Sequence, residues 1–457
     1  MNRNNVRDFT TGDTKRLILA FFLPMLLTNS LQQIYTFVDT FIVGKGLGDN
    51  SLAAVGNMGS LFFFIVGFSL GLSNGFGIVI AQSYGAKDFA RLRRNVAATI
   101  QLAVLITIIL SIVSVSLLPA ALKLLKTDSI IIEDCLKYGY IIFGGLFSSI
   151  MYNISACILR SLGDSRTPLN AIVISSVTNV ILDCLFIFVL RTGVEGAAIA
   201  TVISQVLSAA VCIRKLSKID FLKLGRNDFK VDMSLWWTML RNGIPMACMN
   251  SITATGCMVV QSFVNGLGVD YTSAYSVCSK YINLFMNPAF TSGQAISSFA
   301  GQNYGAGKYD RINEGLRVCL AISMFFYITL GSVMVFASHQ LADLLLDGEI
   351  PIMLAESYLP IAGMMLISVD FLFVYRSAAQ GMGFPVIPMI SGIAEMTLRI
   401  VVIITFINRF GFAATALAEA AAWTGALLVN MVAYYIHLPR DRQDFIKKHN
   451  ITVKKVF

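Results

Sequence analysis

A polar stripe runs along the first long apolar segment of the chain, residues 17–43. Thr28, Gln32, Tyr35 and Asp39 recur at helical spacing, so they share one face of an otherwise apolar helix. An ionisable side chain inside a membrane span costs roughly 2.5 to 3.5 kcal/mol, and it is retained mainly where it binds an ion, a proton or a substrate. We therefore expect Asp39 to face protein or water and to bind an ion, a proton or a substrate. Pairing with a basic residue of a neighbouring helix is the alternative.

The same segment contains a proline at position 24. Proline cannot donate its backbone nitrogen to the helix, and its ring collides with the preceding turn, so a helix usually bends at such a residue. Pro24 is therefore the candidate hinge of this helix.

The composition places the chain among polytopic membrane proteins. Hydrophobic residues make up 56% of the sequence, charged residues make up 13%, and the mean hydropathy is +0.71. A helix needs roughly 20 apolar residues to cross a hydrocarbon core of about 30 Å. Twelve runs meet this need, at 17–43, 51–80, 96–118, 134–159, 168–190, 193–213, 235–264, 272–299, 316–338, 352–379, 384–408 and 412–437.

The distribution of lysine and arginine predicts the orientation of these runs. The first run is too long for a cleavable signal peptide, so we expect it to remain as a membrane anchor. With the amino terminus inside, most of the basic residues fall in internal segments, as cytoplasmic loops require. We expect a plasma-membrane protein with both termini in the cytoplasm. The net charge of +9 follows from this topology, and because no basic stretch is interleaved with aromatic residues, we expect no nucleic-acid partner.

The chain also repeats itself at a shift of about 220 residues, which is a sign of internal duplication. Blocks that recur in the same order are Pro24 and Pro245, QSYGA at 82–86 and QNYGA at 302–306, and GVEGAAIA at 193–200 and GFAATALA at 411–418. Each copy holds six runs, an even number, so both copies enter the membrane from the same side. The predicted fold is all-α, with twelve transmembrane helices in two six-helix lobes related by a parallel repeat.

This repeat divides the chain into four parts. We expect an amino-terminal lobe over 1–213, a cytoplasmic linker over 214–234, a carboxy-terminal lobe over 235–438 and a basic cytoplasmic tail over 439–457. Two equivalent lobes around a central cleft, with the substrate reached near the midplane, form a transporter architecture.

Several of these features together resemble the multidrug and toxic compound extrusion (MATE) family, in its bacterial type. They are the two Gln-Tyr-Gly-Ala blocks, the early prolines of the first and seventh runs, the Leu-Gly-Asp turn at 162–164 followed by Pro168, and Val-Asp at 38–39. The resemblance covers residues 10 to 440. It implies a cation-coupled antiporter that exports amphipathic, often cationic, drugs across the lipid bilayer, and we expect it to act as a monomer without a cofactor.

The resemblance also implies a cation-binding cluster in the amino-terminal lobe. The matching residues are Asp39, Asn179, Asp183 and Thr201. Two carboxylates, an amide and a hydroxyl are all hard oxygen ligands, and they can share a proton or hold a dehydrated monovalent cation; no other metal site is expected. Interhelical hydrogen bonding is the alternative role of Asn179 and Thr201. We expect protons to be the coupling ion, with sodium as the alternative.

The second copy departs from this pattern. At the repeat shift, Asp39, Asn179 and Thr201 correspond to Val260, Arg399 and Glu419. Glu395 lies four residues before Arg399 on the same predicted helix, so the two charges can pair. A fixed guanidinium leaves little room for an exchangeable cation. We expect Glu395, Arg399 and Glu419 to form a structural network, with a role in coupling as the alternative, and Asp370 to be the second-lobe carboxylate that could join it.

Substrate is expected between the lobes. The residues predicted to line that pocket are Gln32, Tyr35, Asn153, Gln261 and Asn283, with methionine and phenylalanine supplying adaptable apolar surface. A lipid-linked oligosaccharide flippase of a related superfamily is the closest alternative, but it should carry more buried basic residues. A membrane-embedded enzyme is less consistent, because no run holds a histidine or a hydrolase motif.

Overall fold

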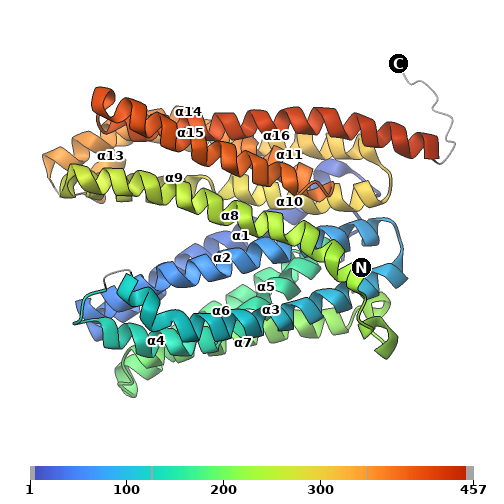
Figure 1. Cartoon of the computed structure of the whole chain (residues 1–457), viewed down its shortest axis with the longest axis horizontal. Helices are drawn as coiled ribbons and strands as arrows, with labels where there is room; N and C mark the ends of the chain where they lie inside the picture. Colours follow the sequence, from blue (N-terminus) through green and yellow to red (C-terminus); the bar gives the residue numbers. More distant parts are fainter. Residues whose placement is uncertain (1–5, 125–126, 347, 449–457) are drawn as a thin grey trace. The chain divides into compact units, whose positions relative to one another are not determined.

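The structure is a computed structural model that describes residues 6–124, 127–346 and 348–448. The first five residues of the predicted amino-terminal lobe and residues 449–457 of the predicted basic tail lie outside the described residues. The described part of the chain is built from helices and their connections, without β-strands. Figure 1 shows these helices in the colour order of the sequence. The expected all-α membrane architecture is confirmed.

The helices pack into two compact units. Unit 1 holds Leu23–Ala247 together with residues 6–8, and unit 2 holds Phe9–Phe22 together with residues 248–448. The first turns of the first helix therefore pack with unit 2, while the predicted linker at 214–234 and the turns that follow it pack with unit 1. The two exchange points lie within two residues of Pro24 and Pro245.

Two long helices are divided between the units, namely α1 (Thr14–Leu47) and α8 (Met233–Leu267). The other elements of unit 1 are α2 (Asp49–Gly85), α3 (Phe89–Leu124), α4 (Ile132–Gly144), α5 (Leu146–Ser161), α6 (Arg166–Asp183), the π-helix η1 (Cys184–Val189), α7 (Val194–Ser217) and the short 3₁₀ helices η2 (Asp220–Leu222) and η3 (Arg226–Phe229). Those of unit 2 are α9 (Val269–Phe285), α10 (Asn287–Gly305), α11 (Tyr309–Phe326), the π-helix η4 (Tyr327–Gly331), α12 (Ser332–Phe336), α13 (Ser338–Asp343), α14 (Glu349–Gly381), α15 (Val386–Phe410) and α16 (Ala413–Lys448).

Each of the expected apolar runs falls on helix, but two of them are broken. The run 134–159 appears as α4 and α5, which bend by 45° at Gly145. The run 272–299 appears as α9 and α10, which meet at Met286. Within the described residues, 10 helices are long and apolar enough to cross a membrane, or 11 if the bent pair is one span.

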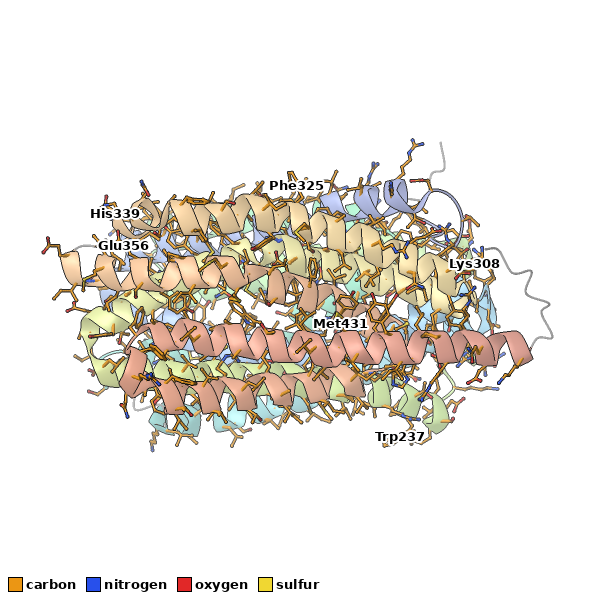
Figure 2. All side chains as sticks on the ribbon, turned by 90° about the horizontal axis from the view of Figure 1, so that it is seen from above. Trp237, Lys308, Phe325, His339, Glu356 and Met431 are labelled. Carbon is orange, nitrogen blue, oxygen red and sulfur yellow. The ribbon has the colours of Figure 1, made fainter. Side chains whose placement is uncertain are left out.

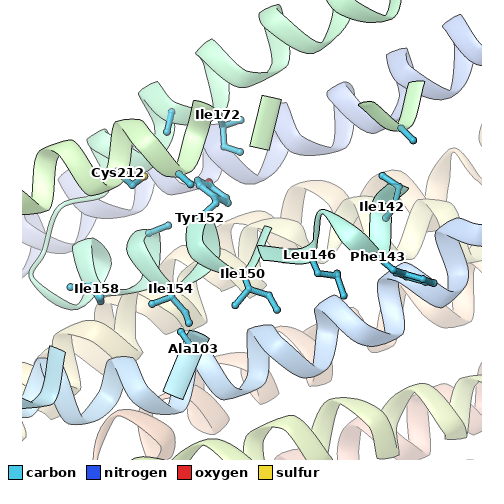
Figure 3. Close-up of a cluster of buried hydrophobic side chains, with 14 of the residues drawn as sticks. Ala103, Ile142, Phe143, Leu146, Ile150, Tyr152, Ile154, Ile158, Ile172 and Cys212 are labelled. Atoms are coloured by element: carbon cyan, nitrogen blue, oxygen red, sulfur yellow. The ribbon is translucent and has the colours of Figure 1, made fainter. Parts of the chain in front are cut away.

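Each unit has its own apolar core. In unit 1 the core is centred on α5, whose Ile150 and Ile154 are buried against α3 near Ala103 (Figure 3). In unit 2 the core gathers around Tyr358 of α14, whose ring packs against Tyr275 and Phe412. Large hydrophobic side chains also remain exposed all along the helices, as expected where the outer surface of a protein contacts lipid instead of water.

The connections within each unit alternate between its two ends. In unit 1, Asp8 pairs with Lys87 and the backbone of Arg7 bonds to Leu162, so the connections at 6–8, 86–88 and 162–165 share one end. In unit 2, Figure 2 shows His339 and Glu356 at one end and Lys308 at the other. This alternation is what an even number of spans per repeat predicts.

Candidate functional site

Two carboxylates come together in unit 1, one half-buried and one fully buried. Asp39 lies on α1 and Asp183 is the last residue of α6, and the two side chains are in direct electrostatic contact. Asp183 is fully buried, and so is Asn179 one turn earlier on the same helix. The structure therefore brings together the acidic residues that the family resemblance implied.

The local backbone around Asp183 is unusual. The α-helix gives way immediately after this residue to the π-helix η1. Such wide turns are rare and occur frequently at functional sites, because they turn side chains away from the regular helical register. A Cβ on Gly46 would lie 2.4 Å from Ile187 of η1, so the absence of a side chain there lets α1 approach the π-helix. The small residue at position 46 thus helps to seat α1 beside Asp183.

Thr201 and two tyrosines complete the cluster. Thr201 is buried on α7 and interacts with the hydroxyl of Tyr35, which was expected to line the substrate pocket. Tyr138, on α4, lies in electrostatic range of Tyr35, Asp39 and Asp183. Tyr138 is not predicted from the sequence, because no pattern within its own run 134–159 shows that it faces Asp39; its burial beside the two carboxylates in the structure identifies it.

The polar atoms of this cluster are poorly satisfied. Oδ1 of Asp39, both carboxylate oxygens of Asp183 and both polar atoms of Asn179 are buried without a hydrogen bond of normal geometry. Buried polar groups are nearly always hydrogen-bonded, so such a cluster calls for an explanation. Asp39 forms no ion pair among the described residues, which removes the alternative of a basic partner there. Four oxygen-bearing side chains without a neutralising charge can accept a proton or a small cation.

The candidate hinge, Pro24, lies about four turns before Asp39 on α1. The helix continues through Pro24, and the hydroxyl of Thr28 donates to the Pro24 carbonyl at 2.8 Å. Bonds of this kind from Thr or Ser to the preceding turn compete with the backbone and bend helices slightly. Bending at Pro24 stays a prediction. Pro24 lies next to the point, between Phe22 and Leu23, where α1 passes from unit 2 to unit 1.

The corresponding place in unit 2 holds ion pairs. Nη2 of Arg399 lies 3.1 Å from Oε1 of Glu395 and 2.8 Å from Oε2 of Glu419. Arg376 adds a second guanidinium, 2.7 Å from Oε2 of Glu395. All four side chains are at least nine-tenths buried. The two positive and two negative charges balance one another, as expected for a network with a structural role.

Arg376 was not included in the predicted network. Its place within the apolar run 352–379 was the signal that should have drawn attention to it, since a charge at such a position needs a partner. Asp370, on the same helix α14, is buried, and its Oδ1 has no hydrogen bond. It is not among the ion pairs of the described residues, so it stands apart from the network around Arg399.

The five predicted substrate residues belong to different units. Gln32, Tyr35 and Asn153 lie in unit 1, where Gln32 is exposed and the other two are half-buried. Gln261 and Asn283 lie in unit 2, where Gln261 donates to Asn265 at 2.7 Å and Asn283 is exposed. Partly exposed polar side chains on apolar helices suit a ligand-facing surface, and their shared role stays a prediction.

The chain is similar to known proteins over most of its length. The family model MatE matches it twice, over residues 24–185 and 245–405, which confirms the internal repeat. The probable multidrug resistance protein YoeA of Bacillus subtilis is 31% identical over 76% of this chain and 76% of its own length. The probable multidrug resistance protein NorM of Thermotoga maritima is 22% identical over 91% of this chain and 89% of its own length.

Solved structures show the same fold. One is described as the outward-facing conformation of a multidrug resistance MATE family transporter of the MOP superfamily; it aligns with a TM-score of 0.88 and 22% identity, covering 95% of this chain and 98% of that chain. Another, of MATE in the bent conformation, aligns with a TM-score of 0.88 and 21% identity over the same shares. With a family model matched in both repeats and a relative above 30% identity, this chain belongs to the MatE family.

Proposed function

We propose that the protein is a cation-coupled antiporter that exports amphipathic, often cationic, drugs and toxic organic compounds by alternating access. Relatives named as multidrug resistance proteins support this substrate class. The proposal places the protein in the plasma membrane as a monomer, with both termini in the cytoplasm. It carries no catalytic step, and its coupling ion is a proton, with sodium as the alternative.

One observation carries the proposal. Among the described residues, no positive side chain pairs with Asp39 Oδ1 or with the two oxygens of Asp183, whereas the buried carboxylates Glu395 and Glu419 of unit 2 are ion-paired. An uncompensated buried carboxylate is unstable as an anion, so it must be neutralised by a proton or a cation that can come and go. Two carboxylates in contact cannot both stay charged in an apolar surrounding, and this favours at least one bound proton.

A coupling cycle follows from this chemistry. Protons that enter from outside neutralise the charge that the pair still carries, so that α1 and α6 pack together without a counter-charge and α1 can bend near Pro24. The bend drives the substrate out, and release of the protons to the cytoplasm restores the first state. Tyr35 links the two events in this scheme, because it contacts Thr201 of the cluster and lies on the same helix as the predicted substrate residue Gln32.

Energy limits the stoichiometry. A charge that crosses the membrane gains about 2.3 kcal/mol per 100 mV. A pH difference of one unit supplies about 1.4 kcal/mol, or a factor of ten in concentration. Exchange of one proton for one monovalent drug cation moves no net charge, so only the pH difference drives it. Steeper export requires two protons, and the cluster offers two carboxylates.

The test is efflux of a fluorescent organic cation from vesicles that contain the purified protein, at a clamped membrane potential. We expect a pH gradient to drive accumulation with sodium absent. If the pH gradient drives nothing and sodium restores transport, the proton assignment is wrong and the cation site is retained. If neither gradient drives transport, the antiport proposal is wrong.

Asp39→Asn provides the matching site variant. It keeps the shape of the side chain but removes the titratable group, so we expect no accumulation against a gradient, while the variant still folds and inserts. Asp49→Asn is the control, since it removes an exposed carboxylate at the start of α2. Accumulation by the Asp39→Asn protein at the wild-type level would exclude Asp39 from coupling.

A further inference from the structure

A polar cavity of about 170 Å³, open at the surface where Arg91 and Arg94 are exposed, lies in unit 1 at the end that carries the Asp8–Lys87 pair. It is formed where the start of α3 meets the start of α8. Its lining residues are Arg91, Arg94, Asn95, Asp232, Ser234, Leu235 and Thr238. The volume is several times the share of one liquid water molecule, roughly 30 Å³. The cavity is separate from the carboxylate cluster and has no part in the cycle proposed above.

The charges of the lining are suited to an anion. Arg91 and Arg94 form no ion pair among the described residues, although Arg93 between them lies 3.8 Å from Asp228. The only acidic side chain of the lining, Asp232, is engaged as the cap of α8, where its Oδ1 accepts from the backbone nitrogens of Ser234 and Leu235. Two free guanidiniums beside the amino-terminal end of a helix attract negative charge.

Asn95 supplies an independent sign of a ligand. Its side chain is fully buried, and its Nδ2 donates to Ser83 Oγ at 2.6 Å, which fixes the amide orientation. Asn95 belongs to the lining, and its Oδ1 is then a buried acceptor that receives no hydrogen bond from the described residues. A ligand that fills the cavity should therefore combine an anionic group for the arginines with a hydroxyl donor for Asn95.

The second repeat provides an internal comparison. At the same shift, Arg91 and Asn95 correspond to Arg311 and Gly315. Nη2 of Arg311 donates to the carbonyl of Phe9 at 3.1 Å, and the ring of Phe299 lies against Gly315, where a Cβ would come within 2.6 Å. In unit 2 this place is thus occupied by the protein itself.

Phe9 itself shows how the two copies diverged. It is 1% exposed and packs against Phe21 and Phe299, whereas its counterpart Phe229 in unit 1 is 38% exposed. Phe9 thus fills this position in unit 2, whereas Phe229 does not fill the corresponding position in unit 1. Arg94 also differs from its counterpart in unit 2. That counterpart is a carboxylate, Glu314, which accepts a hydrogen bond from Thr14. The cavity of unit 1 is therefore a specific departure from the repeat.

The surroundings of the cavity indicate where its ligand comes from. Val231, Met233 and Trp237 flank the lining and are largely exposed, and Figure 2 shows Trp237 at the outer edge of the ribbon. Exposed tryptophan beside basic residues is typical of the boundary between membrane and water. We propose that this cavity binds the headgroup of an anionic phospholipid with a free hydroxyl, such as a glycerol phosphodiester, while its acyl chains lie along the exposed apolar side chains.

Recognition follows from the named groups. Arg91 and Arg94 hold the phosphate oxygens by charge-assisted hydrogen bonds, and Asn95 accepts from a headgroup hydroxyl. Basic pockets on the cytoplasmic side of membrane proteins bind anionic lipids in this manner. Occupation would tie α3 to the first turns of α8, a helix whose turns after Ala247 belong to unit 2.

Binding is tested on the purified full-length protein by native mass spectrometry, with phosphatidylglycerol and with phosphatidylcholine of the same acyl chains. The lining variant is Arg91→Gln/Arg94→Gln. The control is Arg93→Gln/Lys230→Gln, which removes the same charge nearby but outside the lining. We expect the lining variant to bind phosphatidylglycerol at least about tenfold more weakly than the control, because it loses the charge-assisted hydrogen bonds of both guanidiniums to the phosphate. If phosphatidylglycerol binding weakens equally in the two variants, the lipid is held only by general electrostatic attraction to the basic surface, and the proposal is wrong.

A second variant and a second probe complete the test. Ser234→Phe fills the cavity without a change of charge, and we expect it to lose phosphatidylglycerol binding as well. Inorganic phosphate should compete only weakly; if it binds the lining selectively and phosphatidylglycerol does not, the lipid assignment is wrong. The assay measures binding without transport, so its outcome is independent of the proposed antiport.

Discussion

The two units differ in what neutralises the carboxylates among their helices, although these carboxylates lie at different repeat positions. In unit 1, Asn179 lies one turn before Asp183 on α6, and neither Asp183 nor Asp39 forms an ion pair among the described residues. In unit 2 the same position is Arg399, which neutralises Glu395 and Glu419 at 3.1 and 2.8 Å. A built-in guanidinium occupies permanently the place that an exchangeable cation would need. The comparison therefore separates a lobe that can change its charge from a lobe whose charge is fixed.

This difference also separates two kinds of energetic cost. A buried ion pair contributes little net stability, yet removal of one partner leaves an uncompensated charge and is strongly destabilising. An unpaired buried carboxylate has the reverse property, since its neutralisation relieves a cost. Coupling thus requires a site that binding of the ion stabilises. Among the described residues compared here, Asp39 and Asp183 of unit 1 form such a site, and the ion-paired Glu395 and Glu419 of unit 2 do not.

The largest effect is expected when unit 1 is given the pattern of unit 2. Asn179→Arg would place a fixed cation between Asp39 and Asp183, as Arg399 lies between Glu395 and Glu419. We expect accumulation of a fluorescent organic cation in vesicles to fall to the level of protein-free vesicles, because the site no longer needs a proton or sodium. Asn179→Ser, which keeps a neutral polar side chain, should retain transport. Full activity of the Asn179→Arg protein would break the comparison.

A large effect on stability is expected in unit 2. Arg399→Met leaves Glu419 buried without a partner, so we expect the free energy of unfolding in mixed detergent to fall by about 3 to 5 kcal/mol. Combination with Glu419→Gln should recover most of that loss. Asp39→Asn should have no such cost, since it removes an unpaired charge. A comparable loss of stability in Asp39→Asn would mean that unit 1 also depends on a fixed charge.

Much of this arrangement follows from the sequence, and the exceptions have physical causes. Hydrophobic runs and the repeat predict helices and lobes because both depend on patterns along the chain. Tyr138 and Arg376 escaped prediction because their partners come from other helices, and the pattern of one helix does not state which neighbours it meets. The breaks at Gly145 and Met286 escaped for a different reason, since both lie inside continuous apolar runs.

The exchange of helix segments is a further feature that periodicity alone did not reveal. Phe9 is held in unit 2 by a bond from its nitrogen to Gln302 at 2.9 Å, and Lys308 donates to Thr10 at 2.7 Å. These contacts join residues some 300 positions apart in a chain of 457. Local composition at 9–22 predicts a helix but contains no sign that its first turns pack against the second repeat.

A smaller, kinetic effect is expected at the hinge. Pro24→Ala restores a backbone donor in α1 next to the exchange point, so the helix should bend less readily. We expect turnover to slow by up to about tenfold while substrate affinity changes little, as is usual when a conformational step limits the rate. Pro360→Ala is the control, because Pro360 also lies inside a helix but remains within unit 2. Equal slowing in both variants, or unchanged turnover in Pro24→Ala, would remove the hinge.

The smallest effect is expected at Asp370, which is the sharpest test of whether unit 2 takes part in coupling. Like Asp183 it is buried with an unbonded carboxylate oxygen, but among the described residues no second carboxylate interacts with it. A lone carboxylate in an apolar surrounding is most stable in its neutral form and has no reason to release its proton in each cycle. Asp370→Asn preserves that neutral shape, so we expect the pH-driven export rate to stay within a factor of about two of wild type, which corresponds to a change in barrier of well under 1 kcal/mol. The measurement is the initial rate in vesicles at two proton gradients. Loss of the dependence on the gradient would show that Asp370 titrates during transport, and the contrast between a titratable and a fixed unit would then have to be abandoned.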